Sequence, residues 1–350
     1  MSFLRALIGA ARSARHTPRL AAGSVPDDDV LLDAPDERLA PALVAAALAD
    51  PEPAAKLLAT TRDCGEWEDR DRYVTRLATF AYHRDDWLTH WLAVAPGDPD
   101  ALLVTAQLSV RRAWESPARA ERLRELEPLI RTMAEEAPHD PVPWRLALDH
   151  ARGAHARPAV FEALWEQAVR RSPHHYGCHV AALKYLSAQW YGSHRAAFDF
   201  AEQAADDAAA DSLVRALPVR AAYDRLRVPA DREPAVPEER VDRAADRALA
   251  LSAVFPAGDP WPAEVRNLLA YVLVERARWE DARAEFGRIG AYATSFPWGS
   301  SPGGGRGAGG EDPLRRFLTA RDTARTELAR RTPLWDTGRG RAGRGGPGGH

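Results

Sequence analysis

The fold is decided between residues 95 and 141, where the chain reads APGDPDALLVTAQLSVRRAWESPARAERLRELEPLIRTMAEEAPHDP. Apolar residues recur here at spacings of three and four, which is the period of a helix that buries one face. Leu102, Leu103, Leu108 and Val110 form the first stripe, and Leu123, Leu126, Leu129, Ile130 and Met133 form the second. The stretch therefore predicts two helices, over about 98–115 and 118–137, that pack against neighbours.

Proline and aspartate mark the ends of these helices at regular intervals. Pro96, Pro138 and Pro173 follow one another at 42 and 35 residues, and a proline just past a helix prevents it from continuing. Asp98 and Asp140 can cap the helices that follow. Two helices per unit at this interval are typical of a helical repeat, and strand patterns are nearly absent from the chain. The sequence therefore predicts an all-α protein, a superhelical array of antiparallel helix pairs.

Residues 264–290 carry a more specific pattern. Leu269 and Ala270 form a large–small pair in the first predicted helix, and Phe286 follows Ala282 by four positions in the second. Small residues let two helices approach closely, while the aromatic ring fills the gap to the next pair. On these residues the segment resembles a tetratricopeptide repeat (TPR), which implies a TPR-like α-solenoid.

A weaker copy of this pattern covers residues 141–173, where Trp165, Ala168 and Pro173 fit the second helix. More broadly, residues 83–298 are similar to uncharacterised bacterial TPR-like proteins that carry a domain of unknown function. The motifs that suggest this are Trp190-Tyr191-Gly192-Ser193, Phe286-Gly287-Arg288-Ile289-Gly290 and Phe296-Pro297-Trp298. This second resemblance implies a helical fold and no particular activity.

The composition divides the chain into five parts. They are a flexible basic arm and acidic linker (1–35), the TPR-like helical array (36–298), a flexible Gly-rich loop (299–311), a C-terminal helix (312–331) and a disordered Gly/Arg tail (332–350). The Gly-rich parts contain too little apolar surface to fold. Gly192 is expected to adopt a positive φ in the turn after Trp190, with Ser193 capping the next helix.

Net charge and cysteine content indicate which partners and which cellular compartment the protein is suited to. The formal net charge is −3, so the chain has no bulk attraction to nucleic acid or anionic membrane. Nearly all positive charge is arginine, because Lys56 and Lys184 are the only lysines. Together with abundant Ala, Pro and Gly, this bias is typical of the codon usage of a GC-rich bacterial genome. Two distant cysteines, Cys64 and Cys178, favour a reducing compartment, and no apolar run could span a bilayer. We therefore expect a bacterial, cytoplasmic protein with no transmembrane segment.

The best metal-site candidate is Ser172–His179, which reads SPHHYGCH. On a helix, His175 and His179 share one face, and His174 and Cys178 share another, as metal ligands must. The alternative interpretation is a helix entrance in which two histidines meet by chance, since no acidic ligand lies nearby in the sequence. No catalytic, cofactor or phosphate-loop motif is present, and our prediction is a protein with neither metal nor cofactor.

Aromatic residues are the candidates for partner contacts. Eleven tryptophans are present, and most are expected to fill gaps between helix pairs. Trp87, Trp91, Trp190 and Tyr191 could instead line a binding groove, because Trp and Tyr are enriched at binding hot spots.

The resulting hypothesis is a non-catalytic scaffold that binds a protein or peptide of unknown identity, in an unknown oligomeric state. One alternative is a metalloprotein or enzyme whose site is assembled from distant residues near His174–His179. A second is weak RNA binding through the arginines of the two termini, without specific recognition of a nucleic acid.

Overall fold

A computed structural model describes residues 25–227, 236–299 and 312–331 of the chain. This part of the protein is all-helical apart from one pair of two-residue strands, which confirms the predicted all-α class. None of its helices is both long and apolar enough to cross a membrane.

The elements of the first half are η1 (Asp27–Asp29), β1 (Leu31–Leu32), α2 (Leu39–Ala46), α3 (Glu52–Asp63), α4 (Trp67–Ala81), α5 (Asp86–Val94), α6 (Pro99–Glu115), α7 (Arg119–Glu136), α8 (Val142–Gly153) and α9 (Pro158–Arg171). Those of the second half are α10 (Tyr176–Tyr185), α11 (His194–Asp207), η2 (Leu213–Ala216), α12 (Leu217–Arg227), α13 (Glu238–Ser252), α14 (Ala263–Glu275), α15 (Trp279–Ile289), β2 (Tyr292–Ala293), α16 (Ser295–Trp298) and α17 (Pro313–Arg331).

The two helices predicted between residues 95 and 141 are present as α6 and α7. Asp98 caps α6, because its side chain accepts hydrogen bonds from the backbone N–H groups of Asp100 and Ala101. Val110 and Met133, one from each predicted stripe, are buried. Periodicity and capping therefore place both helices to within two residues.

The helices over 264–290 also form a packed pair, α14 and α15. Leu269, Ala270 and Ala282 are completely buried, and Phe286 is 5% exposed. Ala277, in the turn between the two helices, takes a positive φ of 53°. The earlier segment 141–173 likewise forms the packed pair α8 and α9.

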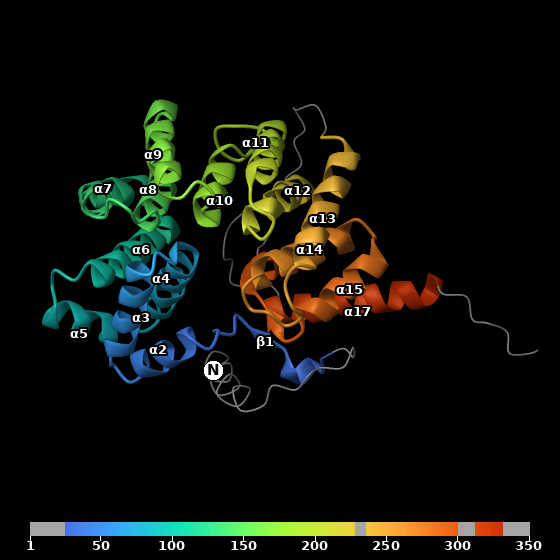
Figure 1. Cartoon of the computed structure of the whole chain (residues 1–350), viewed down its shortest axis with the longest axis horizontal. Coiled ribbons are helices and arrows are strands. Elements are labelled where there is room, and N and C mark those ends of the chain that lie inside the picture. Colours follow the sequence, from blue (N-terminus) through green and yellow to red (C-terminus); the bar gives the residue numbers. More distant parts are fainter. Residues whose placement is uncertain (1–24, 228–235, 300–311, 332–350) are drawn as a thin grey trace, which may run out of the picture.

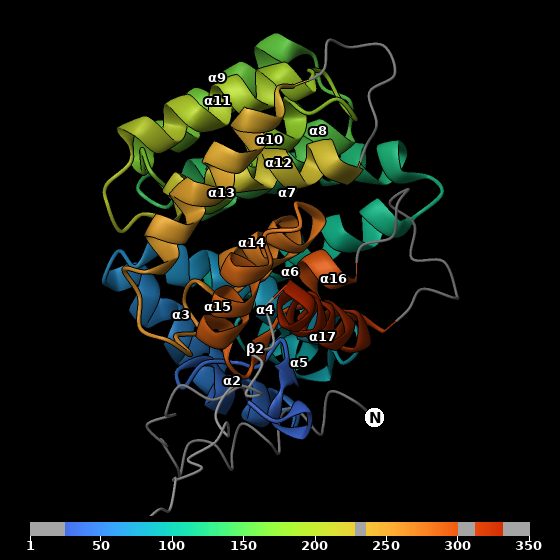
Figure 2. The same cartoon turned by 90° about the vertical axis from the view of Figure 1, so that its right-hand side faces the viewer.

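The helices divide into two groups joined by α10 and α11 (Figure 1). In Figure 1, α2 to α9 lie on one side and α12 to α17 on the other, with the segment that carries β1 crossing below. In Figure 2, turned by 90°, the two groups overlap, and α9, α11 and α12 lie above α15 and α17. One hydrophobic cluster fills each group, and a third, around Leu148, Phe161 and Cys178, packs α8 and α9 against α10. α4 contacts α6, α8 and α10, and α12 contacts α10 and α14.

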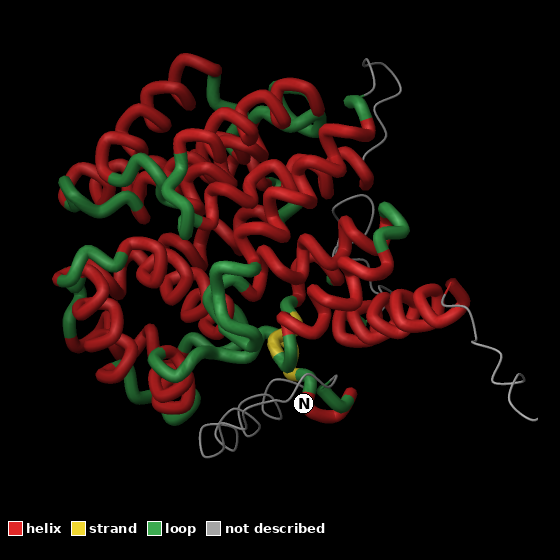
Figure 3. The backbone as a smooth tube through the Cα atoms, turned by 45° about the vertical axis from the view of Figure 1, so that its right-hand side comes forward, coloured by secondary structure: helices red, strands yellow, loops and turns green. Residues whose placement is uncertain are grey.

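The start of the described chain is tied to its end. β1 pairs in parallel with β2, so that Leu31 lies opposite Tyr292 and Leu32 opposite Ala293 (Figure 3, yellow). The carboxylate of Asp33 accepts a 3.0 Å hydrogen bond from the backbone N–H of Ser295, and Asp27 forms an ion pair with Arg321.

These contacts involve part of the segment 1–35 that the sequence predicts to be flexible. Residues 25–35 contact the rest of the chain through the β1–β2 pair and through charge pairs with α17 and α4. Two leucines are too short a run to predict a strand, and their partner lies more than 250 residues away. The predicted arm over 1–24, the Gly-rich loop from 300 to 311 and the tail over 332–350 lie outside the described residues.

A buried arginine joins four parts of the first half. The Arg70 side chain, on α4, is 2% exposed and donates to Asp140 at 2.6 Å, to Asp100 at 2.6 Å and to the Leu58 carbonyl at 2.9 Å. Asp140 also accepts the N–H of Val142 at the start of α8. One guanidinium therefore holds α4 to the middle of α3 and to the starts of α6 and α8.

Arg266 has the same role in the second half. This residue of α14 is completely buried, and it donates to the Ser252 and Phe255 carbonyls, both at 2.8 Å, and to the Pro256 carbonyl at 2.9 Å. It therefore satisfies the last carbonyl of α13, which has no partner within that helix, and two carbonyls of the turn that follows.

The turn after Trp190 differs from its prediction. Ser193 caps α11 as expected, but Gly192 does not have a positive φ. Glycine is required there for another reason, because a Cβ atom would lie 2.1 Å from the Leu186 carbonyl oxygen. The turn folds back onto the end of α10, where the N–H of Ser193 bonds to that carbonyl.

Replacing Arg70 with methionine should destabilise the fold by about 3–5 kcal/mol, because Asp100 and Asp140 would stay buried without their shared partner. Urea unfolding followed by circular dichroism measures the loss. Arg62→Met is the control: Arg62 also pairs with Asp100, but its side chain is 35% exposed, so it should cost less than about 1 kcal/mol. Equal losses for the two variants would contradict the assignment.

Gly192→Ala should cost about 1–3 kcal/mol, because the new methyl group overlaps backbone that cannot move freely. Gly97→Ala is the matched control, since nothing lies within 4 Å of a Cβ there and the φ of Gly97 is not positive. That variant should be neutral or slightly stabilising. Thermal unfolding of the two proteins side by side decides the question, and similar melting temperatures would refute the close approach.

Candidate binding groove between α7, α8 and α9

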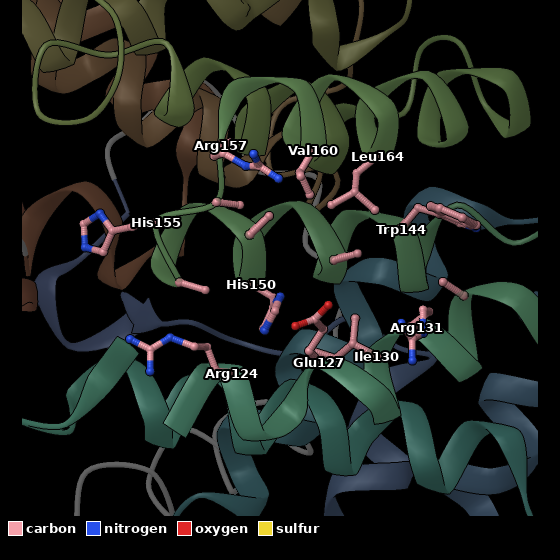
Figure 4. A pocket seen from close by; sticks show the side chains of 15 residues that line it. Arg124, Glu127, Ile130, Arg131, Trp144, His150, His155, Arg157, Val160 and Leu164 are labelled. Atoms are coloured by element: carbon pink, nitrogen blue, oxygen red, sulfur yellow. The ribbon is translucent and has the colours of Figure 1, made fainter. Parts of the chain in front are cut away.

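A groove of about 510 Å³ opens between α7 and α9, with α8 beneath it. Figure 4 shows the arrangement: α7 is one wall, α9 is the other, and α8 runs between them. Arg131 and Trp144 lie at one end, and Arg124 and His155 at the other. The volume is in the range of ligand-binding pockets of proteins.

Small apolar side chains make the floor of the groove. Ala147 and Ala151 on α8 and Ala154, the C-cap of that helix, follow one another at spacings of four and three, so they lie on one side of it. Ile130 on α7 and Leu164 on α9 complete the apolar lining. Because alanine side chains are short, the surface of α8 lies lower than its neighbours, and α7 and α9 form the walls on either side of it.

Arginines surround this apolar floor. Arg124, Arg131 and Arg157 are all exposed, and none forms an ion pair or a side-chain hydrogen bond with another described residue. Many other arginines in the same part of the chain have carboxylate partners, for example Arg170 with Glu166 on α9. The three rim arginines are therefore available to an incoming negative charge.

Two polar side chains lie inside the groove. His150 bonds through Nε2 to the Leu123 carbonyl at 2.6 Å, and burial lowers the pKa of its ring. The Glu127 side chain points toward His150 in Figure 4. Trp144 is 9% exposed, Arg171 covers its ring at 4.2 Å, and its indole N–H lacks an acceptor among the described residues. The groove is therefore apolar at its floor and positive at its rim.

A second polar cluster lies where α4, α8, α10, α12 and α14 face one another, and we call it the inner charged cluster. On α8, Asp149 pairs with Arg152 at 3.0 Å and with Arg145 at 3.4 Å. On α12, Arg220 pairs with Glu264 at 2.7 Å. Burial raises the pKa of Asp149, but Arg152, Lys184 and Arg145 outweigh this effect and lower the pKa to about 2.

Lys184 is the unusual member of the inner charged cluster. Burial lowers its pKa to about 8, with Arg220 and Arg152 acting in the same direction against Asp149. No described residue forms an ion pair or hydrogen bond with its ammonium group. Burial also raises the pKa of the neighbouring Asp224 carboxyl. Perturbed groups of this kind are common at functional sites and also occur in structural networks.

The metal-site candidates do not converge on a common point. His175 is the N-cap of α10 and lies outside the helix, contrary to the expected helical pair with His179; its Nδ1 accepts the Cys178 N–H at 3.2 Å. His179 contacts the His175 carbonyl at 3.0 Å, while His174 is exposed. In the described ranges, no three His, Cys, Asp or Glu side chains are arranged to hold a metal ion.

Of the four aromatic candidates, two lie in the core and two stack on neighbouring rings. Trp87 and Trp91 are 0% and 4% exposed, so the prediction that they could line a groove is wrong: both belong to the core of the first half. Trp190 packs edge-on against Trp114, with Arg152 stacked over both rings. Tyr191 remains 43% exposed and stacks on Tyr185.

The groove residues could not be predicted from the sequence, because none of them belongs to a recognisable motif. Arg124 and Arg131 resemble the solvated face of a surface helix, and alanine is abundant throughout the chain. The one available signal was their spacing of seven, which places both on one side of α7. Lys184 was visible only as one of two lysines. The Arg-rich termini considered for RNA binding lie outside the described residues.

Comparison of the chain with known protein families, with curated proteins and with solved structures finds no match.

The stability of the protein should depend on the titration of Lys184. Between about pH 8 and pH 10.5 the unfolded lysine binds a proton that the folded one has released, so stability should rise with pH across this window. Below it both states are protonated and the cost of burying the charge is constant. In urea unfolding, Lys184→Met should therefore gain on the order of 1–3 kcal/mol over the natural protein at pH 7, and lose most of this gain by pH 10.

Lys56→Met is the matched control, because Lys56 is exposed on α3 and is the only other lysine. A stability difference for Lys184→Met that changes with pH no more than that of Lys56→Met would show that Lys184 is solvated.

Proposed function

We propose that this protein is a non-catalytic, TPR-like helical-repeat scaffold that binds a segment of a partner protein, and that the groove between α7, α8 and α9 receives the segment. The observation that carries this proposal is the combination of an apolar floor with three exposed arginines at its rim that form no ion pair with any described residue. An apolar centre within a polar rim is the usual anatomy of a protein interface.

Packing supports a groove that exists before the partner arrives. α7 and α9 each pack directly on α8, and the third hydrophobic cluster fixes α8 and α9 against α10. A preformed surface does not have to be ordered on binding, so more of the contact energy is retained as affinity. A superhelical stack of helix pairs produces such surfaces through the rotation between neighbouring pairs.

The side chains at the rim favour a polypeptide as the occupant. Arginine is enriched at interface hot spots, because its guanidinium donates several hydrogen bonds and its stem covers apolar surface. Val160, on the α9 wall, is 44% exposed and adds apolar area beyond the floor.

Site-specific photo-crosslinking in the native cell tests the proposal. A photoreactive phenylalanine analogue in place of Val160 should give an adduct with a defined protein, identified by mass spectrometry. Val254 is the matched control position: it is also an exposed valine, at 56%, but it follows α13 and lies far from the groove lining. The adduct should be absent or much weaker there.

Adducts that are identical at the two positions, or no adduct at Val160 while the protein is folded and abundant, would contradict a partner in the groove. The adduct should also disappear when the rim arginines are replaced. That result would show that the cross-link depends on the arginines and does not arise from nonspecific binding.

A further inference from the structure

We infer that the occupant of the groove is an acidic amphipathic helix, which packs its apolar face on the α8 floor and carries carboxylates seven residues apart. The inference rests on the proposed function, because it specifies the partner segment that the groove would bind. It follows from the charge, the spacing and the size of the residues that line the groove.

The charged residues that line the groove favour an acidic ligand. The lining contains three arginines, at positions 124, 131 and 157, and a single carboxylate, Glu127. Burial keeps the pKa of His150 low, so this ring does not add a positive charge at neutral pH. The groove is therefore positive in a chain whose formal net charge is −3, and a basic ligand would meet repulsion.

The spacing of the rim arginines on α7 predicts the spacing of the acidic residues on the ligand. Arg124 and Arg131 are seven residues apart on one helix, so they lie about 10 Å from each other along α7. Figure 4 shows their side chains near opposite ends of the groove, with Glu127 directed away from both toward His150. A ligand helix that runs beside α7 has the same rise per residue, and its carboxylates at i and i+7 therefore meet both guanidiniums.

The short side chains of the groove floor favour a helix over an extended strand as the ligand. The floor is a stripe of alanines along α8, flanked by α7 and α9, and low side chains on one helix let a second helix approach to ordinary packing distance. Ala147 and Ala151 are four residues apart on α8, so ligand positions i+4 and i+8, which have the same separation and lie to one side of the two carboxylates, would rest on them. Leucine or isoleucine at those positions fills the apolar space.

The test uses three designed peptides of about 18 residues with the same apolar stripe. One carries Glu at i and i+7, the second carries Gln there, and the third carries Lys. Binding of the labelled peptides to the full chain is measured by fluorescence anisotropy at about 50 mM salt. The Glu peptide should bind about 5- to 30-fold more tightly than the Gln peptide, and the Lys peptide more weakly than either.

A charge exchange on the protein separates recognition from misfolding. The double variant Arg124→Glu/Arg131→Glu should reverse the order and prefer the Lys peptide, which a merely destabilised protein would not do. Arg122→Glu/Arg170→Glu is the matched control, with the same change of charge at two exposed positions on α7 and α9 that do not line the groove. This variant should keep the preference for Glu.

The outcomes distinguish the two proposals. Equal binding of the Glu and Gln peptides, or no reversal in the exchanged variant, overturns the acidic-helix inference and leaves the scaffold standing. If none of the three peptides binds but a specific adduct forms at Val160, the acidic-helix inference is again overturned and the scaffold proposal stands, because something other than an acidic helix then occupies the groove. Failure of the peptides without any adduct overturns both proposals.

Discussion

The fold depends on two buried guanidinium groups that donate hydrogen bonds to several other helices and to the turn after one of them. Arg70 joins α3, α4, α6 and α8 through two carboxylates and one carbonyl, and Arg266 satisfies the last carbonyl of α13 and a carbonyl of the turn that follows. A lysine could not replace either residue, because a single ammonium does not spread its donors over a planar fork. Arginine in this chain, which composition alone would attribute to codon usage, therefore holds each half together.

This constraint explains how far the sequence predicts the structure. Helices such as α6 and α7 follow from apolar spacing and from Asp98, which are local signals. The partners of Arg70 lie 30 and 70 positions away, and β1 and β2 are farther apart still, so no local pattern shows these contacts. The same limit applies to the groove, since Arg124 becomes a rim residue only when α9 is placed opposite α7.

Where prediction from sequence was wrong, the backbone gives the reason. His175 was expected on a helical face, but it caps α10, and its ring turns back to accept an N–H of that helix. Trp87 and Trp91 were considered for a partner surface, yet large rings four residues apart on α5 fill the core of the first half. The functional candidates came instead from small or common residues: the alanines of α8 and the unpaired arginines around them.

The pairing of β1 with β2 has a consequence for the evolution of the chain. Open helical-repeat proteins gain or lose units by gene duplication and deletion, because each unit contacts only its neighbours. In this chain β1 pairs with β2 across nearly the whole described sequence, so that Leu31 lies opposite Tyr292. An insertion or deletion of helices between them would have to keep this register, whereas a substitution on an exposed helix face leaves it unchanged.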